Sequence, residues 1–168
     1  MKKIGTNGLE IIKKWEGLED GDPSTINLDP YLCPADVWTI GWGHAIVYNR
    51  RHLTVHNDPV GDLARSLYPG GINLEQAEKL LIAETAGVAL QVDNLVKVEI
   101  TDNMFDALVS FAYNVGTGNL KRSTLLRKLN SRSYTGAADE FPKWRRANGI
   151  ILQGLVNRRA DERILFLS

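Results

Sequence analysis

The feature that most constrains the fold is a long helical repeat of apolar residues that begins after residue 73. Residues 73–76 (Asn-Leu-Glu-Gln) have the form of a capping box, in which two side chains satisfy backbone N–H groups at the start of a helix. Apolar residues then recur at helical spacing as far as Val96. The pattern predicts the longest helix of the chain, within residues 73–100, and a helix of this length can connect two lobes.

Shorter helices are predicted on both sides of this one. Residues 7–10 (Asn-Gly-Leu-Glu) also have the form of a capping box, and Gly17 is a natural stop, so we expect a short helix between them. Thr101 is expected to cap a further helix that Gly116 ends. Pro142 favours a bend or a break where it falls inside a helix. The last three helices are expected at about residues 120–130, 134–146 and 154–167.

The remaining segments predict one small antiparallel sheet and two polar insertions. Residues 31–46 are rich in β-branched and aromatic side chains, which favours strands. Residues 19–30 are turn-rich and acidic, as in a surface loop, and residues 47–72 are polar with one or two helical turns near 63–67. The expected class is mainly α (α+β), with two lobes in a single domain. Its parts are a small α/β lobe (1–72), a connecting helix (73–100) and a helical lobe (101–168).

Composition fits a globular domain without a membrane anchor. Hydrophobic residues make up 43% of the 168 residues and charged residues 24%, which are ordinary values. No apolar run approaches the roughly 20 residues that span a bilayer, and no secretory signal is visible at the start. The single cysteine excludes an internal disulfide and fits a reducing compartment. Residues 121–168 are basic, and we interpret this excess as solvated helix faces rather than as a binding site for an anionic polymer.

The sequence predicts no metal site. Four carboxylates lie within residues 19–30, but their spacing does not match a calcium-binding EF-hand loop. His52 and His56 lie four residues apart, yet no cysteine or glutamate completes a zinc pattern with them. Both groups are therefore interpreted as solvated loop residues.

The strongest candidate for acid chemistry is Glu16. It lies at the C-terminal end of the first helix, between Trp15 and Leu18. The helix dipole and the apolar neighbours both disfavour the ionised carboxylate, and a protonated carboxyl is what a general acid needs. Asp29 and Asp36 are possible second carboxylates, and such a pair is typical of glycosidic cleavage.

Three further polar residues lie on or beside the predicted strands, namely Cys33, Thr39 and His44. Cys33 and His44 could form the nucleophile and base of a cysteine hydrolase. We favour this alternative less, because Pro34 follows the cysteine where a helix N-terminus would activate it.

The motifs of the chain resemble those of the phage-type lysozymes, the endolysins of glycoside hydrolase family twenty-four. The similarity begins with Trp-Glu-Gly at residues 15–17 and with Tyr-x-Cys and Thr-Ile-Gly-x-Gly-His within residues 31–44. It continues in residues 101–116, which include Asp-Asn-x-Phe-Asp-Ala-Leu, and in residues 154–163. It covers nearly the whole chain and leaves out residues 19–30 and much of 47–72.

The resemblance implies hydrolysis of the β-1,4 bond between N-acetylmuramic acid and N-acetylglucosamine in peptidoglycan. It assigns Glu16 as the general acid, Thr39 as a holder of the attacking water, and Cys33 to a position that is aspartate in many members. A thiol stabilises positive charge poorly unless it ionises, so Asp36 is a possible additional carboxylate. The gap between Glu16 and Cys33 is longer than usual for the family, because the acidic loop lies within it.

The resemblance also implies supporting residues. His44 is expected to order the sheet through hydrogen bonds, and Arg159 matches a position that pairs with the catalytic glutamate, although it could equally be a surface residue of an arginine-rich helix. The expected sugar-contacting residues are Tyr113, Asn114, Ser123 and Thr124.

The expected function is therefore that of a muramidase that lyses the host at phage release. The alternatives are a lytic transglycosylase, which forms 1,6-anhydro products, and a glycan-binding protein without catalysis. The resemblance implies a monomer with peptidoglycan as its partner, no cofactor or metal, no nucleic acid and no stable membrane anchor. It further implies residence in the host cytoplasm until a holin-type pore gives access to the cell wall.

Overall fold

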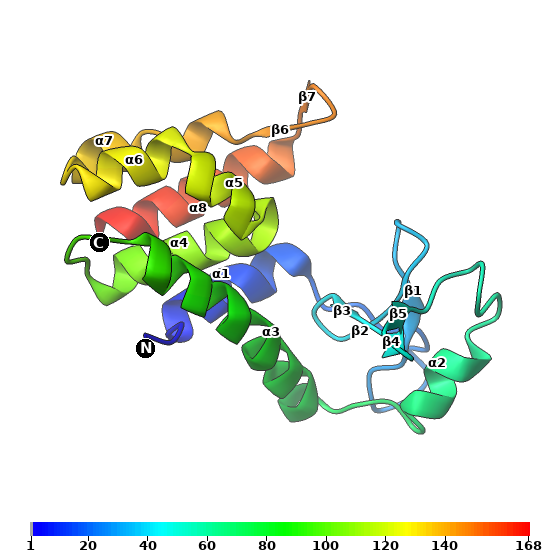
Figure 1. The fold of residues 1–168 in the computed structure, drawn as a ribbon. Helices are drawn as coiled ribbons and strands as arrows, with labels where there is room; N and C mark the ends of the chain where they lie inside the picture. The colour runs from blue at the N-terminus through cyan, green and yellow to red at the C-terminus, as the bar shows by residue number, and fades with distance from the viewer. Residues whose placement is uncertain (1) are drawn as a thin grey trace. The chain divides into compact units, whose positions relative to one another are not determined.

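The computed structural model describes residues 2–168, which form two compact units (Figure 1). The helical unit contains the chain up to Trp15 together with Thr85–Ser168, and the sheet unit contains Glu16–Glu84. Helix α3 (Leu74–Leu95) contributes to both units. The unit boundaries therefore differ from the predicted ranges, because the N-terminal helix groups with the C-terminal helices and the long helix is divided between the units.

The helical unit is built around α4 (Asp102–Val115), which packs against α8 (Gln153–Leu167). Its core combines aliphatic residues with packed aromatic rings: the rings of Phe111 and Phe141 meet edge to face at 5.3 Å, and the rings of Phe141 and Phe166 lie 5.5 Å apart. The other elements of this unit are α1 (Thr6–Glu16), α5 (Thr117–Arg122), α6 (Thr124–Asn130), α7 (Tyr134–Ala138), the 3₁₀ helix η1 (Phe141–Lys143), β6 (Arg146–Ala147) and β7 (Ile150–Ile151).

The sheet unit holds the antiparallel sheet β1–β2–β3, formed by Tyr31–Leu32, Trp38–Ile40 and His44–Ala45. Within it Tyr31 is opposite Thr39, and Ile40 is opposite His44. A hairpin, β4 (Val47–Tyr48) with β5 (Arg51–His52), and a short helix, α2 (Asp62–Leu67), follow. The core of the unit consists of Trp38, Ile40, Ile46, Leu53, Ala64, Ile72 and Ala77.

Helix ends agree with the sequence where the capping partner is local. The predicted capping box of α3 is present: the Asn73 side chain accepts from the Gln76 N–H, and the Gln76 side chain accepts from the Asn73 N–H, both at 2.9 Å. The Thr101 hydroxyl accepts from the Met104 N–H and caps α4. Both predictions are confirmed, as is the end of α4 at Gly116.

The predicted cap of α1 is wrong. The helix begins at Thr6, so Asn7 lies inside it rather than before it. The capping acceptor comes from α4: the buried Asp106 carboxylate accepts from the Gly5 N–H at 2.7 Å and from the Gly8 N–H at 3.0 Å. A distant carboxylate therefore does what the local side chain was expected to do.

The predicted bounds of two C-terminal helices are also wrong. The expected helix at 120–130 is divided at Ser123, which caps α6. The expected helix at 134–146 ends at Ala138, and Pro142 lies in η1. A hairpin follows, in which Asn148 and Gly149 have φ angles of 49° and 80°, the left-handed values of a tight two-residue turn.

The fold class, mainly α with small antiparallel sheets, is as expected. The predicted α2 segment, the surface loop at 19–30 and the sheet within 31–46 are confirmed. Across residues 2–168, none of the helices combines the length and the apolar character that crossing a membrane requires.

Candidate active site

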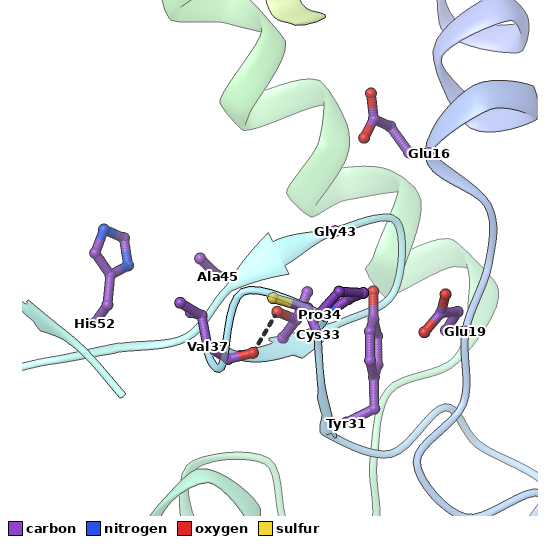
Figure 2. A pocket seen from close by; sticks show the side chains of 10 residues that line it. Glu16, Glu19, Tyr31, Cys33, Pro34, Val37, Gly43, Ala45 and His52 are labelled. Atoms are coloured by element: carbon purple, nitrogen blue, oxygen red, sulfur yellow. Dashed lines mark hydrogen bonds between the residues drawn. The ribbon is translucent and has the colours of Figure 1, made fainter. Parts of the chain in front are cut away.

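A pocket of about 500 Å³ lies in the sheet unit and contains the residues that the sequence singled out for catalysis (Figure 2). Glu16, Cys33 and Thr39 all line it, although they come from a helix end, a turn and a strand. The remaining lining residues are Glu19, Tyr31, Pro34, Val37, Gly43, Ala45 and His52. Its volume is within the range of sites that bind small molecules or a few sugar units.

Glu16 is the last residue of α1 and is partly buried. Gly17 follows it with a φ of 74°, so the chain leaves the helix directly after the carboxyl. Gly43, with a φ of 80°, faces this carboxyl: a β-carbon added to Gly43 would lie 4.0 Å from Glu16 Oε2. Glycine at this turn therefore gives the chain its left-handed conformation and leaves the space beside the carboxyl open.

Cys33 and Thr39 are held by one backbone carbonyl. The Val37 oxygen accepts from the Cys33 N–H and from the Thr39 hydroxyl, each at 3.0 Å. The turn after β1 and the start of β2 are thus tied together, and the second of these hydrogen bonds is drawn in Figure 2. Thr39 is only 3% exposed, so its hydroxyl has a fixed position at the pocket wall.

The surroundings of the Cys33 sulfur favour the thiolate. Burial alone would raise the pKa of this thiol, but the N–H groups of Ala35 and Val37 and the Thr39 hydroxyl interact with the sulfur and outweigh burial, so the pKa is lowered. The expected weakness of a thiol in a carboxylate position is therefore reduced, because a lower pKa favours the charged form of the thiol.

Asp36 and Asp29, the possible second carboxylates, do not line the pocket. Asp36 lies in the exposed turn with a φ of 59°, and its N–H donates to the Cys33 carbonyl at 2.9 Å. Asp29 accepts from the Thr25 hydroxyl at 2.6 Å within the acidic loop. The second carboxylate in the lining is instead Glu19, three residues after Glu16.

Sequence reasoning did not single out Glu19, Tyr31 or His52 as site residues. Burial, followed by the neighbouring carboxylates of Glu19 and Glu16, raises the pKa of Tyr31 to about 12, so its hydroxyl remains a proton donor at neutral pH. Tyr31 belongs to the Tyr-x-Cys motif of residues 31–33, which could have indicated it. His52 enters the pocket only because β5 pairs with β4, and Figure 2 shows it on the side of Val37 and Ala45.

His44 lies beside the pocket rather than in its lining. Its Nδ1 is 2.7 Å from Oε1 of Glu84, which joins β3 to α3 within the sheet unit. The contact is an ion pair only when the imidazole is protonated. This geometry supports the expected structural role, in which His44 orders the sheet.

Arg159 belongs to the helical unit and is fully buried, so it is not the surface residue that the arginine-rich helix allowed. Its Nη2 donates to Asn114 Oδ1 at 2.7 Å, and its Nε lies 3.1 Å from Glu162 Oε2 without the alignment of a hydrogen bond. Burial lowers the pKa of Arg159 to about 10, against the opposing effect of Glu162, so the guanidinium remains charged at neutral pH.

The expected sugar-contacting residues also lie in the helical unit and have different surroundings. Asn114 is exposed but uses its side-chain oxygen to bind Arg159, and Tyr113 is half-buried. The Ser123 hydroxyl donates to the Leu120 carbonyl and accepts from the Leu126 N–H, so it is occupied as a helix cap. Thr124, the first residue of α6, is half-buried.

The described residues contain no group of three or more histidine, cysteine, aspartate or glutamate side chains that could hold a metal ion. The pocket itself offers groups for acid–base and electrostatic chemistry: a carboxyl, a thiol whose pKa is lowered, and a hydroxyl in a fixed position.

Comparison with known proteins agrees with the site. Residues 13–162 match the family described as phage lysozyme, and the chain belongs to this family. An endolysin of Bacillus phage B103 is 41% identical over 98% of the chain, which spans 54% of that relative's length. An endolysin of Acyrthosiphon pisum secondary endosymbiont phage 1 is 38% identical, with 98% of each covered. The solved muramidase domain of SpmX from Asticaccaulis excentricus is 32% identical, with a TM-score of 0.74 and coverage of 100% of this chain and 99% of that domain.

Proposed function

We propose that the protein is a muramidase that hydrolyses the β-1,4 bond between N-acetylmuramic acid and N-acetylglucosamine in bacterial peptidoglycan. The observation that carries this proposal is that Glu16, Cys33 and Thr39 line a single pocket. The family supports a lytic enzyme of the cell wall, and the name of the SpmX domain supports the muramidase reaction.

In the proposed reaction, the Glu16 carboxyl gives its proton to the oxygen that bridges the two sugars, and the bond from this oxygen to the anomeric carbon breaks. Positive charge develops on the sugar, and the Cys33 thiolate stabilises it electrostatically. A water molecule forms the new bond to the anomeric carbon and gives a proton to the thiolate. Proton exchange with solvent then restores both groups.

Thr39 is suited to orient this water. The Thr39 hydroxyl lies beside both the Val37 carbonyl and the Cys33 sulfur, and its oxygen has two lone pairs, one of which can accept a hydrogen bond from a water molecule in the pocket. A buried, oriented hydroxyl holds water with little loss of side-chain entropy, since its rotamer is already fixed.

The central test replaces Glu16. Glu16→Gln keeps the shape of the side chain but removes the acid, so we expect the clearing rate of a peptidoglycan suspension to fall by about 10²-fold or more. Cys33→Ser is expected to lower the rate by roughly tenfold, because serine does not supply the thiolate charge. Glu10→Gln, on the same helix but bound to Lys13, is the matched control and should leave the rate unchanged. A native clearing rate for Glu16→Gln would refute the proposal.

A second comparison asks which carboxylate assists Cys33. Glu19 lines the pocket and Asp36 does not, so we expect Glu19→Gln to slow turnover by a few-fold to about tenfold and Asp36→Asn to have little effect. Turnover of both variants is measured on the same cell-wall preparation. Slower turnover of Asp36→Asn, with Glu19→Gln normal, would show that the turn aspartate supplies the charge instead.

A lytic transglycosylase is the second candidate, and the cysteine in place of a carboxylate favours it. In that reaction Glu16 serves as acid and then as base, and the sugar's own hydroxyl replaces water. The anhydro product is one water lighter than the hydrolysed one, so mass spectrometry of digested peptidoglycan separates the two reactions.

We also propose that the protein acts as a monomer and remains in the host cytoplasm until a holin-type pore gives it access to the wall. The names of the endolysin relatives support action on the wall at phage release. Expression with and without a pore-forming protein tests this: lysis that proceeds equally without the pore would contradict it.

A further inference from the structure

The C-terminal end of α1, which carries Glu16, is held by a carboxylate of α8. Asp161 Oδ2 accepts from Trp15 Nε1 at 2.9 Å and from Lys14 Nζ at 2.7 Å. The Lys14 ammonium also lies over the Trp15 ring, 5.1 Å from its centre. These three residues, which we call the α1 clamp, all belong to the helical unit. Glu16 follows Trp15 directly in the chain, so its carboxyl lies one residue beyond an anchored indole.

Helix α1 depends on contacts of this kind because it is short. It has 11 residues, and isolated helices shorter than about 12–15 residues are marginal in water. Its last backbone carbonyls have no partner inside the helix, so the final turn is the part that opens most easily. Gly17, the next residue, has no side chain that could hold this end. Order in the last turn therefore depends on tertiary contacts, and Asp161 supplies them from 146 positions beyond Trp15.

The main connection of the α1 clamp is the hydrogen bond between Asp161 and Trp15. The Asp161 side chain is 29% exposed and Trp15 is half-buried, so water competes little for either group. A hydrogen bond to a charged acceptor is roughly twice as strong as one between neutral groups, and the single N–H of the indole fixes the direction of the ring. The Lys14 side chain is 60% exposed, and an ion pair so open to water adds little.

We propose that Asp161 is a positioning residue for the acid of the reaction: by holding Trp15, it keeps the last turn of α1 helical and limits the directions in which the Glu16 carboxyl can point. The proposal rests on the proposed function, since it takes Glu16 as the general acid. Loss of helical backbone at Glu16 would spread the carboxyl over several conformations, of which only a fraction can protonate the bridging oxygen. Both ends of α1 are thus held by distant carboxylates, because Asp106 of α4 caps its start.

Kinetics separates positioning of the acid from binding of the substrate. Asp161→Ala is expected to lower kcat by roughly tenfold and to leave KM unchanged, because Glu16 acts in the transition state and a misplacement of about 1 Å can cost up to about 10²-fold. Trp15→Phe removes the indole donor and should have the same effect, and the double variant should be no slower than the slower single variant. Asp139→Ala, which breaks another carboxylate contact of α8 (with Arg163, at 2.8 Å), is the matched control and should keep the native kcat.

Hydrogen exchange tests the structural step without relying on activity. In Asp161→Ala we expect the backbone amides of residues 13–16 to exchange several-fold faster than in the native protein, while exchange in α4 stays unchanged. Faster exchange in α4 as well would mean that the whole helical unit of this variant opens, and Trp15→Phe then carries the test.

The outcomes separate this inference from the proposed activity. A native kcat in both Asp161→Ala and Trp15→Phe, or a lower kcat with unchanged exchange at the end of α1, overturns the inference and leaves the muramidase proposal intact. A higher KM with unchanged kcat, or additive losses in the double variant, also overturns it, because both indicate a role other than holding Glu16. If the native protein releases no fragments from peptidoglycan, the muramidase proposal fails, whereas unchanged exchange in Asp161→Ala refutes the α1 clamp in either case.

Discussion

At the scale of single residues, the pocket joins a carboxyl at a helix end to a thiol whose pKa is lowered. Cys33 lies half-buried in the lining, and the N–H groups of Ala35 and Val37 approach its sulfur. An ordinary thiol is mostly protonated at neutral pH. Because the pKa of Cys33 is lowered, this thiol ionises at a lower pH than an ordinary one. The catalytic use of a cysteine therefore depends on the turn that carries it and not on the residue alone.

The lowered pKa of Cys33 can be measured through its reactivity. We expect the rate of alkylation by iodoacetamide to reach half its maximum at a pH below 9.0, the ordinary value for the thiol. Thr39→Val should move this midpoint upward, because it removes a hydroxyl that interacts with the sulfur while keeping the shape of the side chain. An unchanged midpoint in Thr39→Val would show that the backbone N–H groups alone favour the thiolate.

The same shift has a consequence for stability, whose sign follows from linkage. Because the folded state lowers the pKa of Cys33, the contribution of this group to stability is complete above the unfolded pKa. It disappears as the pH falls through the lower, folded-state pKa. The free energy of unfolding, measured at increasing pH in this alkaline range, should therefore rise through the contribution of Cys33 and not fall.

At the scale of elements, the start of α1 depends on a carboxylate from α4. Asp106 is 3% exposed and accepts from two N–H groups of the N-terminal segment, so it does the work of a helix cap and joins two helices of the same unit. Its carboxylate is charged and buried, and its removal would leave both N–H groups without a partner.

We therefore expect Asp106→Ala to lower the free energy of unfolding by about 2–3 kcal/mol, the range for losing a hydrogen-bonded buried charge. The measurement is urea unfolding followed by circular dichroism. Asp102→Ala on the same helix is the control: that side chain is 91% exposed, and its ion pair with Lys2 is expected to contribute less than about 1 kcal/mol. Equal urea midpoints for Asp106→Ala and Asp102→Ala would contradict the proposed role of Asp106 as the cap of α1.

At the scale of the whole molecule, sequence patterns located elements well where the determining contacts are local. The caps of α3 and α4 and the turn at residues 33–37 are determined by residues within a few positions of each other. The start of α1 could not be predicted, because Asp106 is about a hundred residues away. The β6–β7 hairpin could have been predicted, since Asn148-Gly149 is a strong turn signal that the apolar spacing obscured.

The same distinction holds for the site. Cys33 and Thr39 are six positions apart and lie on one turn and strand, so a motif sufficed to place them together. His52 joins the pocket through the pairing of β5 with β4, and no local pattern in the sequence indicates that position.

The buried cluster around Arg159 makes its charged residues depend on one another. Arg158 and Arg159 both meet Glu162, which also accepts from the Ser110 hydroxyl at 2.9 Å, and none of these four residues is more than 3% exposed. Loss of any one charge would leave the other charges buried without their partner. Substitutions at these positions are therefore expected to be coupled, so that replacing one charged residue destabilises the fold less when its partners are replaced as well.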